Sequence, residues 1–238
     1  MDNKKGKLYL IPTTLGDIEP LEVVPQSVKY KIDNLTLFIA ENEKTARRYI
    51  KKISPQKVQA ELKFSNMGKY ANEHEFELYL KPCLQGQSIG LLSEAGVPGI
   101  ADPGAAIVDL AHKNNIQVVP LIGPSSILLA MMASGMNGQS FAFNGYLPID
   151  SKEKKLRIKY LEKISFEKKQ SQLFIETPYR NDKLLADLIK TLHPNTKLCI
   201  ASDITLPNEF IKTLPVKLWK QQKINLHKRP TIFIIYKE

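Results

Sequence analysis

Three glutamates stand where predicted strands end, and their carboxylates are the side chains in this sequence best placed for acid–base chemistry. Glu41 follows Leu-Phe-Ile-Ala, Glu94 follows Leu-Leu-Ser, and Glu176 follows Leu-Phe-Ile. Such a carboxylate can accept a proton from a hydroxyl within hydrogen-bond reach. Structural alternatives stand beside this one: Glu176 can pair with Arg180, and Glu41 can place negative charge at the start of a helix predicted from Lys44. The sequence does not choose among the three.

The loop over residues 93–104 is rich in glycine and proline. It reads Ser-Glu-Ala-Gly-Val-Pro-Gly-Ile-Ala-Asp-Pro-Gly, with three glycines and two prolines in its last nine residues. Glycines let backbone amides approach a ligand closely, and prolines limit the freedom of the loop. The composition therefore suits a preorganised pocket, although a simple turn between a strand and a helix has the same composition.

These residues need elements to position them, and the first half of the chain predicts an alternation of strands and helices. Helices are expected over 44–53, 75–86 and 104–114. Strands are expected at Lys7–Pro12, Leu35–Glu41, Ser88–Ser93 and Gln117–Leu121. The alternation predicts parallel pairing, and ligands bind such sheets beyond the carboxyl ends of the strands.

A second set of elements follows the turn-rich Gly123-Pro124-Ser125-Ser126. Helices are expected over 152–164 and 181–192. Strands are expected around Phe141 and at Leu173–Glu176, Lys197–Ser202 and Thr231–Tyr236. The sequence thus predicts two α/β domains, 1–122 and 123–238, each with a mostly parallel or mixed sheet flanked by helices.

Composition narrows the class of protein. The 238 residues are 43% hydrophobic, enough for a core, and the formal charge of +10 favours an anionic partner. The only two cysteines, Cys83 and Cys199, have no metal-site spacing, and we expect no metal. No apolar run is long enough to predict a membrane helix, and we expect a cytoplasmic protein without membrane contact.

Four ordered blocks carry a family resemblance. They are Leu8–Asp17, Leu91–Gly104, Val118–Ser126 and Phe143–Pro148. Together they resemble the tetrapyrrole methylase superfamily and, within it, the ribosomal RNA small-subunit methyltransferase I family. Weaker similarity at 174–180 and 201–205 extends the resemblance over nearly the whole chain.

The resemblance implies a two-domain fold with the active-site cleft between the domains, a homodimer, and S-adenosylmethionine as methyl donor. It implies 2′-O-methylation of a ribose in small-subunit ribosomal RNA. The same resemblance assigns donor binding to three segments. The residues are Pro12, Leu15, Ser93, Glu94, Ala95, Gly96, Val97, Pro98, Ser125 and Ser126. The two serines can equally cap the apolar helix that follows them.

The sequence also departs from the family pattern. Asn42 and Glu94 stand where the family has aspartate, and Tyr179 stands where it has histidine. These departures indicate a divergent paralogue. They keep two alternatives open, a tetrapyrrole or other small-molecule methyltransferase and a catalytically silent RNA-binding protein.

Two segments and one histidine complete the candidates. Residues 151–169 hold eight Lys or Arg against three Glu, and residues 44–52 hold five basic residues. Both segments can contact RNA phosphates. The alternative for the first is a solvated helix whose apolar stripe is Leu156, Tyr160, Leu161 and Ile164. His74 is a further functional candidate.

Overall fold

The computed structural model describes residues 5–68 and 73–238, without the side chains of 73 and 74. The chain divides into two compact units, Met1–Ser125 and Ser126–Glu238, here unit 1 and unit 2. The sequence predicted a domain boundary after residue 122, three residues before this division. The exact boundary stays a prediction. None of the helices in the described residues is long and apolar enough to cross a membrane.

Unit 1 is built on a five-stranded parallel sheet in the order β3-β2-β4-β1-β5. Its strands are β1 (Lys7–Ile11), β2 (Leu37–Ala40), β3 (Lys63–Asn66), β4 (Ile89–Leu92) and β5 (Gln117–Pro120). The central β4 reads Ile-Gly-Leu-Leu and is buried throughout, as expected for a parallel strand covered on both faces. The predicted parallel pairing is confirmed.

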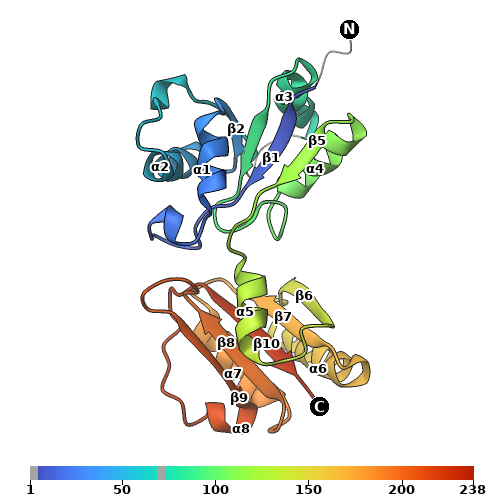
Figure 1. Ribbon diagram of the computed structural model, residues 1–238. Coiled ribbons are helices and arrows are strands. Elements are labelled where there is room, and N and C mark those ends of the chain that lie inside the picture. Colours follow the sequence, from blue (N-terminus) through green and yellow to red (C-terminus); the bar gives the residue numbers. More distant parts are fainter. Residues whose placement is uncertain (1–4, 69–72) are drawn as a thin grey trace. The chain divides into compact units, whose positions relative to one another are not determined.

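Helices cover both faces of this sheet (Figure 1). The helices are α1 (Gln26–Asp33), α2 (Glu43–Ile53), α3 (Glu73–Leu84) and α4 (Gly104–Lys113), with short 3-10 turns at Pro20–Glu22 and Gln59–Glu61. Ala46, Ile50 and Ile53 of α2 recur at helical spacing and enter one core together with apolar residues of α1. Apolar residues of α3 and α4 form a second core on the other face.

Unit 2 has a five-stranded mixed sheet in the order β6-β7-β10-β8-β9, where β6 and β7 are parallel and the other pairs antiparallel. Its strands are β6 (Phe141–Tyr146), β7 (Ser171–Ile175), β8 (Lys197–Ser202), β9 (Phe210–Pro215) and β10 (Thr231–Tyr236). The helices are α5 (Ser126–Ser134), α6 (Ser151–Lys168), α7 (Asn181–Thr191) and α8 (Val216–Trp219). Figure 1 shows α5 in front of the sheet and α7 behind it. The predicted α/β class with two such sheets is confirmed.

The core of unit 2 lies between its sheet and the helices α6, α7 and α8. Phe174 and Phe233 stack there with ring centroids 6.1 Å apart, and the buried Trp219 donates from Nε1 to the carbonyl oxygen of Leu198 at 2.9 Å. The buried face of α6 differs from the predicted stripe, because Leu156 and Tyr160 are exposed. The residues that α6 buries are Lys154, Ile158, Leu161, Glu162 and Ser165.

Candidate functional site

The sheet of unit 1 has a topological switch point between the adjacent strands β1 and β4, because the connections after these two strands run to opposite faces of the sheet. β1 and β4 are neighbours in register from Leu8 with Ile89 to Ile11 with Leu92. The chain leaves β1 toward α1 on one face and leaves β4 toward α4 on the other, as the separate cores show. Such a switch point opens a crevice at the carboxyl ends of the strands, where α/β proteins bind ligands.

Hydrogen bonds join the two loops that leave this point. The backbone N–H of Thr13 donates to the carbonyl oxygen of Gly96 at 2.9 Å, and the Thr13 hydroxyl donates to the carbonyl oxygen of Ser93 at 3.3 Å. The Ser93 hydroxyl donates to the Gly96 carbonyl oxygen at 2.7 Å. Thr13 and Ser93 are both buried. The loops after β1 and β4 therefore form one connected structure.

Two glycines allow Gly123-Pro124, directly before the predicted Ser125 and Ser126, to approach these loops. Gly96 has φ +78°, and a Cβ there would lie 3.1 Å from Leu15 Cδ2 and 3.2 Å from the carbonyl oxygen of Pro124. A Cβ on Gly123 would lie 2.3 Å from Pro12 Cβ. Only a residue without a side chain fits at either place without displacing its neighbours. The loops after β1 and β4 and the residues directly before Ser125 thus meet within unit 1.

One face of α2 holds both loops through side chains at helical spacing. The Thr45 hydroxyl donates to Glu94 Oε1 at 2.7 Å, and the Tyr49 hydroxyl donates to the carbonyl oxygen of Pro12 at 2.8 Å. Lys52 Nζ lies 2.9 Å from Asp17 Oδ1. Burial raises the pKa of Tyr49 above its usual range, so the hydroxyl remains a donor. Because the three positions are four and three residues apart, one helix face makes all three contacts.

A cavity of about 250 Å³ lies between this face of α2 and the two loops. Its lining includes Leu15, Ser93, Glu94 and Ala95 from the predicted donor-binding residues. The lining residues outside that prediction are Thr13, Thr14, Gly16, Asp17, Ile18, Thr45, Ala46, Arg48, Tyr49 and Lys52.

Carboxylates gather at the same edge of the sheet. Burial, followed by the negative charges of Asp102 and Glu94, raises the pKa of Glu41 above its ordinary value. Burial also raises the pKa of Asp102, against the opposing effect of two N–H donors, those of Gly99 and Gly104. Oδ1 of Asp102 accepts from these amides at 2.7 and 2.9 Å, while its buried Oδ2 has no hydrogen-bond partner in the described part of the chain. The edge therefore carries concentrated, incompletely compensated negative charge.

Asn42, next to Glu41, explains one departure from the family pattern. Its side-chain oxygen caps α2 by accepting from the backbone N–H groups of Lys44 and Thr45 at 3.0 and 3.4 Å. Asparagine and aspartate are about equally good in this position. The side chain that caps α2 is therefore that of Asn42, and the alternative offered for Glu41, a negative charge at the start of this helix, is not a capping hydrogen bond.

Glu176 has a different setting, in unit 2 directly after β7. Its side chain is 1% exposed, and Oε1 accepts from the backbone N–H of Thr177 at 2.7 Å and from Nε and Nη2 of Arg180 at 3.0 and 2.7 Å. This is the ion pair weighed as the structural alternative. The adjacent Tyr179 is 69% exposed, and its ring meets His227 edge-to-face.

The remaining predicted residues have the following places. Val97 is half-buried and Pro98 is buried in the loop after β4. Ser125 is buried directly before α5, and Ser126 is the first residue of that helix. The side chain of His74 lies outside the described residues. Within the described residues, no group of three His, Cys, Asp or Glu side chains is arranged to hold a metal ion.

The residues at this edge fit the methyl donor that the resemblance implies. S-adenosylmethionine carries a sulfonium and an ammonium group, and two partly desolvated carboxylates, with the unpartnered Asp102 Oδ2, form an environment that favours cations. Glycine backbone and serine and threonine hydroxyls supply neutral hydrogen-bonding groups beside them.

The sequence analysis did not identify Asp102, Thr45 and Tyr49 as residues of this site. The spacing of Thr45, Tyr49 and Lys52 within one predicted helix could have indicated that they share a face of that helix.

Comparison with known proteins gives the relatives of this chain. Residues 9–218 match the family model described as Tetrapyrrole (Corrin/Porphyrin) Methylases. The chain is 28% identical over 236 residues to "Ribosomal RNA small subunit methyltransferase I" of Buchnera aphidicola subsp. Schizaphis graminum, covering 98% of this chain and 79% of that protein. It is 27% identical over 237 residues to the protein of the same name from Escherichia coli O157:H7, with the same coverage. The predicted resemblance is confirmed.

Solved structures share the fold at low sequence identity. The methyltransferase CobJ matches with a TM-score of 0.64 and 15% identity over 98% of this chain and 94% of that one. Uroporphyrin-III C-methyl transferase from Thermus thermophilus, complexed with S-adenyl homocysteine, matches with a TM-score of 0.56 and 13% identity over 98% of both chains.

The family match spans residues 9–218, which include strands of both sheets and the loops that meet at the switch point. The prediction of an S-adenosylmethionine-dependent methyltransferase is confirmed by the family and by the named relatives. We conclude that the chain belongs to the tetrapyrrole (corrin/porphyrin) methylase family.

Proposed function

We propose that this methyltransferase transfers a methyl group to the 2′-hydroxyl of a ribose in small-subunit ribosomal RNA. The observation that carries the RNA substrate is the similarity, over nearly the whole chain, to proteins named for small-subunit ribosomal RNA. A net charge of +10 supports an anionic substrate, although it does not distinguish RNA from a polycarboxylate macrocycle.

The joined loops after β1 and β4 bind the donor in this proposal, together with the segment at Gly123–Ser126. S-adenosylmethionine, when bound, supplies an electrophilic methyl group on its sulfonium. Because the loops are held in place by hydrogen bonds, they can align donor and acceptor for in-line displacement at a smaller cost in entropy. The new bond forms between the ribose oxygen and the methyl carbon as the bond from that carbon to sulfur breaks.

Glu41 is the best supported of the three candidate bases, and in the proposal it takes the proton of the ribose hydroxyl. Its raised pKa brings it nearer to the working pH, where a carboxylate is a more effective base. Glu94 accepts a hydrogen bond from Thr45, and Glu176 is held by Arg180. Both therefore have hydrogen-bond partners in the fold, whereas the Glu41 carboxylate has none among the described residues.

The test is methyl transfer from labelled S-adenosylmethionine to small ribosomal subunits from a strain that lacks this gene, followed by identification of the labelled nucleoside. We expect label in a 2′-O-methylated nucleoside, and we expect Glu41→Gln to reduce the rate constant by ~10²-fold or more. Glu22→Gln is the matched control, because Glu22 is exposed and forms no ion pair in the described residues.

Each other outcome changes the proposal in a defined way. Label on a base would keep an RNA methyltransferase and reject ribose as the acceptor. Label in a tetrapyrrole but in no RNA would establish the small-molecule alternative. Donor binding without transfer to any substrate would establish a silent paralogue. A fully active Glu41→Gln protein would remove Glu41 as the base.

We also propose a homodimer in the cytoplasm. These features follow from the resemblance alone. Light scattering of the purified protein gives its mass in solution, and a mass of one chain, 26.9 kDa, would reject the dimer.

A further inference from the structure

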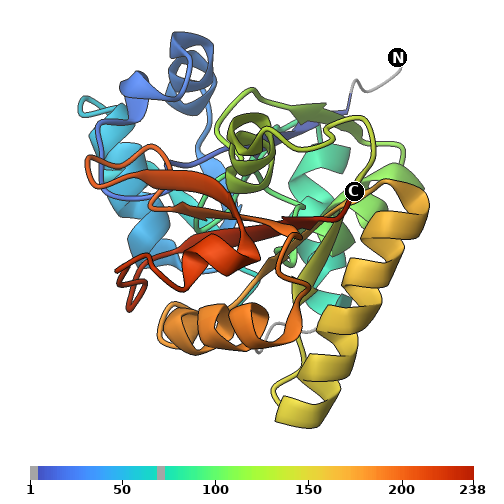
Figure 2. The same cartoon turned by 90° about the horizontal axis from the view of Figure 1, so that it is seen from below.

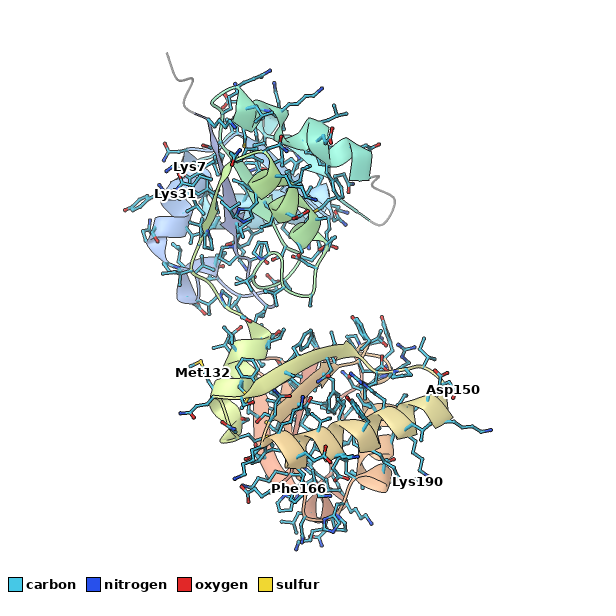
Figure 3. The ribbon with its side chains drawn as sticks, turned by 90° about the vertical axis from the view of Figure 1, so that its right-hand side faces the viewer. Lys7, Lys31, Met132, Asp150, Phe166 and Lys190 are labelled. Atoms are coloured by element: carbon cyan, nitrogen blue, oxygen red, sulfur yellow. The ribbon has the colours of Figure 1, made fainter. Side chains whose placement is uncertain are left out.

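A second cavity, of about 180 Å³, lies in unit 2 between the start of α6 and the end of α7. The residues that line it are Ser151, Lys154, Lys155, Ile158, Asp187, Lys190 and Thr191. Figure 3 shows Asp150, before the first turn of α6, and Lys190, near the end of α7, on the same side of unit 2, with Phe166 at the opposite end of α6. In Figure 2 the N-terminal end of α6 extends away from the strands.

The charges around this cavity are unbalanced. Three lysines face one aspartate among its lining residues, so the lining carries a net charge of about +2 at neutral pH. Lys155 and Lys190 are exposed and have no ion-pair or hydrogen-bond partner in the described residues. The hydroxyls of Ser151 and Thr191 add neutral groups that can donate hydrogen bonds.

Lys154 is the unusual member of this group. Its side chain is 4% exposed, and its ammonium has one partner in the described residues, Asp187 Oδ2 at 3.4 Å. Charge-assisted N–H to oxygen bonds are normally ~2.7–2.9 Å long, and an ammonium has three protons to donate. A buried ammonium held by one long contact is therefore incompletely compensated. An anion in the adjacent cavity would supply the missing acceptors.

The size of the cavity limits the anion. At about 180 Å³ it is smaller than the cavity of about 250 Å³ beside the loops of β1 and β4. A single phosphate group offers several acceptor oxygens in a small volume and suits three lysines and two hydroxyls. The cavity lies in a different unit from the joined loops of β1 and β4, so it is distinct from the candidate site at the β1–β4 switch point.

We propose that the cavity formed by Lys154, Lys155 and Lys190 binds one backbone phosphate of the RNA substrate and so positions the strand on α6. The choice of RNA over free phosphate rests on the proposed function. Lys159, which is exposed and lies four residues after Lys155 on α6, extends the positive surface on which a strand can continue. Lys154 is a binding residue in this proposal, with no part in the chemistry.

The test compares two double variants that remove the same charge from the same two helices. Lys155→Gln with Lys190→Gln removes two cavity lysines, whereas Lys152→Gln with Lys183→Gln removes two exposed lysines that do not line the cavity. Binding of a small-subunit ribosomal RNA fragment is measured against salt concentration. We expect the cavity variant to bind ~10-fold more weakly and to lose ~0.7 from the log–log salt slope relative to the matched control.

Backbone amide NMR gives a direct readout that does not depend on catalysis. The RNA fragment is expected to shift the amides of residues 151–155 and 190–191 in the wild type and in the control, but not in the cavity variant. Inorganic phosphate is titrated separately. Shifts with phosphate but none with RNA would overturn the proposal in favour of a free-anion site. Equal RNA binding by both variants, or no shifts with either probe, would reject the site.

Methyl transfer separates this inference from the function on which it rests. If the RNA fragment occupies the cavity while the wild type methylates no RNA, the proposed reaction fails and the phosphate site stands. If the wild type methylates RNA and the two variants share one KM for RNA, the site fails and the reaction stands. When both are correct, the cavity variant has a raised KM for RNA with kcat unchanged.

Discussion

Glu41 and Asp102 have carboxyl groups in positions where the folded protein disfavours their ionised form. Both carboxyls have raised pKa values because of burial, and Glu41 is also close enough to Asp102 and Glu94 to be affected by their charge. A raised carboxyl pKa means that the ionised form is disfavoured in the folded protein. Such unfavourable charge is typical of sites that gain compensation from a ligand.

The free energy of unfolding should reveal this cost at Glu41. With a folded pKa above the unfolded one, the ionised group destabilises the folded protein at neutral pH, and the penalty disappears as the pH falls below the unfolded value. Glu41→Gln is therefore expected to raise Tm at pH 7 and to change it little near pH 4. Calorimetry at the two pH values measures this, with Glu22→Gln as control. A Tm gain that is the same at both pH values would contradict the prediction.

Gly96 and Gly138 form a matched pair that tests the cost of adding a side chain at a constrained and at an open glycine position. Alanine at Gly96 must adopt φ +78° and fit 3.1 Å from Leu15, whereas a Cβ at Gly138 meets nothing within 4 Å. We expect Gly96→Ala to lower the free energy of unfolding by ~1–3 kcal/mol and Gly138→Ala to change it by less than ~0.5 kcal/mol. Urea unfolding of the two variants measures both values. Equal effects would show that the close approach at Gly96 is unimportant.

Among the elements, α2 has the clearest positioning role, because Thr45, Tyr49 and Lys52 hold the two loops from a single face. The ion pair of Lys52 with Asp17 is exposed and contributes little. The Tyr49 hydroxyl is half-buried and donates to a carbonyl oxygen of a buried residue, so its bond should matter more.

Tyr49→Phe tests this role. Loss of the hydroxyl leaves the Pro12 carbonyl oxygen without this donor and should cost ~0.5–1.5 kcal/mol of stability. If the loop after β1 binds the donor, the Kd for S-adenosylmethionine should rise about three- to tenfold. Titration calorimetry measures the Kd. Tyr30→Phe is the control, since Tyr30 is 59% exposed and its hydroxyl has no partner in the described residues. Identical donor affinity in both variants would contradict the positioning role.

The elements predicted from sequence were those with strong apolar signals. The strands at β1, β2, β4 and β5 and the helices α2, α3 and α4 were placed within a few residues. β3 and β9 were missed because their sequences, Lys-Phe-Ser-Asn and Phe-Ile-Lys-Thr-Leu-Pro, lack an apolar run, as edge strands can. The stripe expected on α6 was wrong at Leu156 and Tyr160, which are exposed, whereas Leu161 is buried as expected. The buried face also includes the long side chain of Lys154, which a pattern of apolar residues cannot reveal.

The candidate site was predictable in part for the same reason. Strand ends identified the loops, but contacts such as Thr13 with Gly96 join residues 83 positions apart. A local sequence pattern cannot predict a contact between residues so far apart in the chain. Likewise, Asp102 gains its unusual environment from burial and from the folded loop, neither of which its sequence neighbours reveal.

Taken as a whole molecule, the protein carries 34 Lys and Arg against 24 Asp and Glu. Association with RNA should therefore depend steeply on salt. Between about 50 and about 200 mM salt, we expect log Kd for small-subunit RNA to rise linearly with log salt. The expected slope is ~0.7 for each phosphate of a single strand contacted. Filter binding or fluorescence anisotropy measures the slope. An affinity that does not change over this range would argue against backbone contacts and toward an uncharged target surface.

The strand order of unit 1 also has a consequence for the growing chain. β1 pairs with β4 and β5, so Leu8 meets Ile89 on one side and Val118 on the other. At ~5–20 residues per second, several seconds of synthesis separate the emergence of β1 from that of its first partner. During that interval the earliest strand to leave the ribosome has no edge to join, and it must be kept from aggregating until more than a third of the protein has been made.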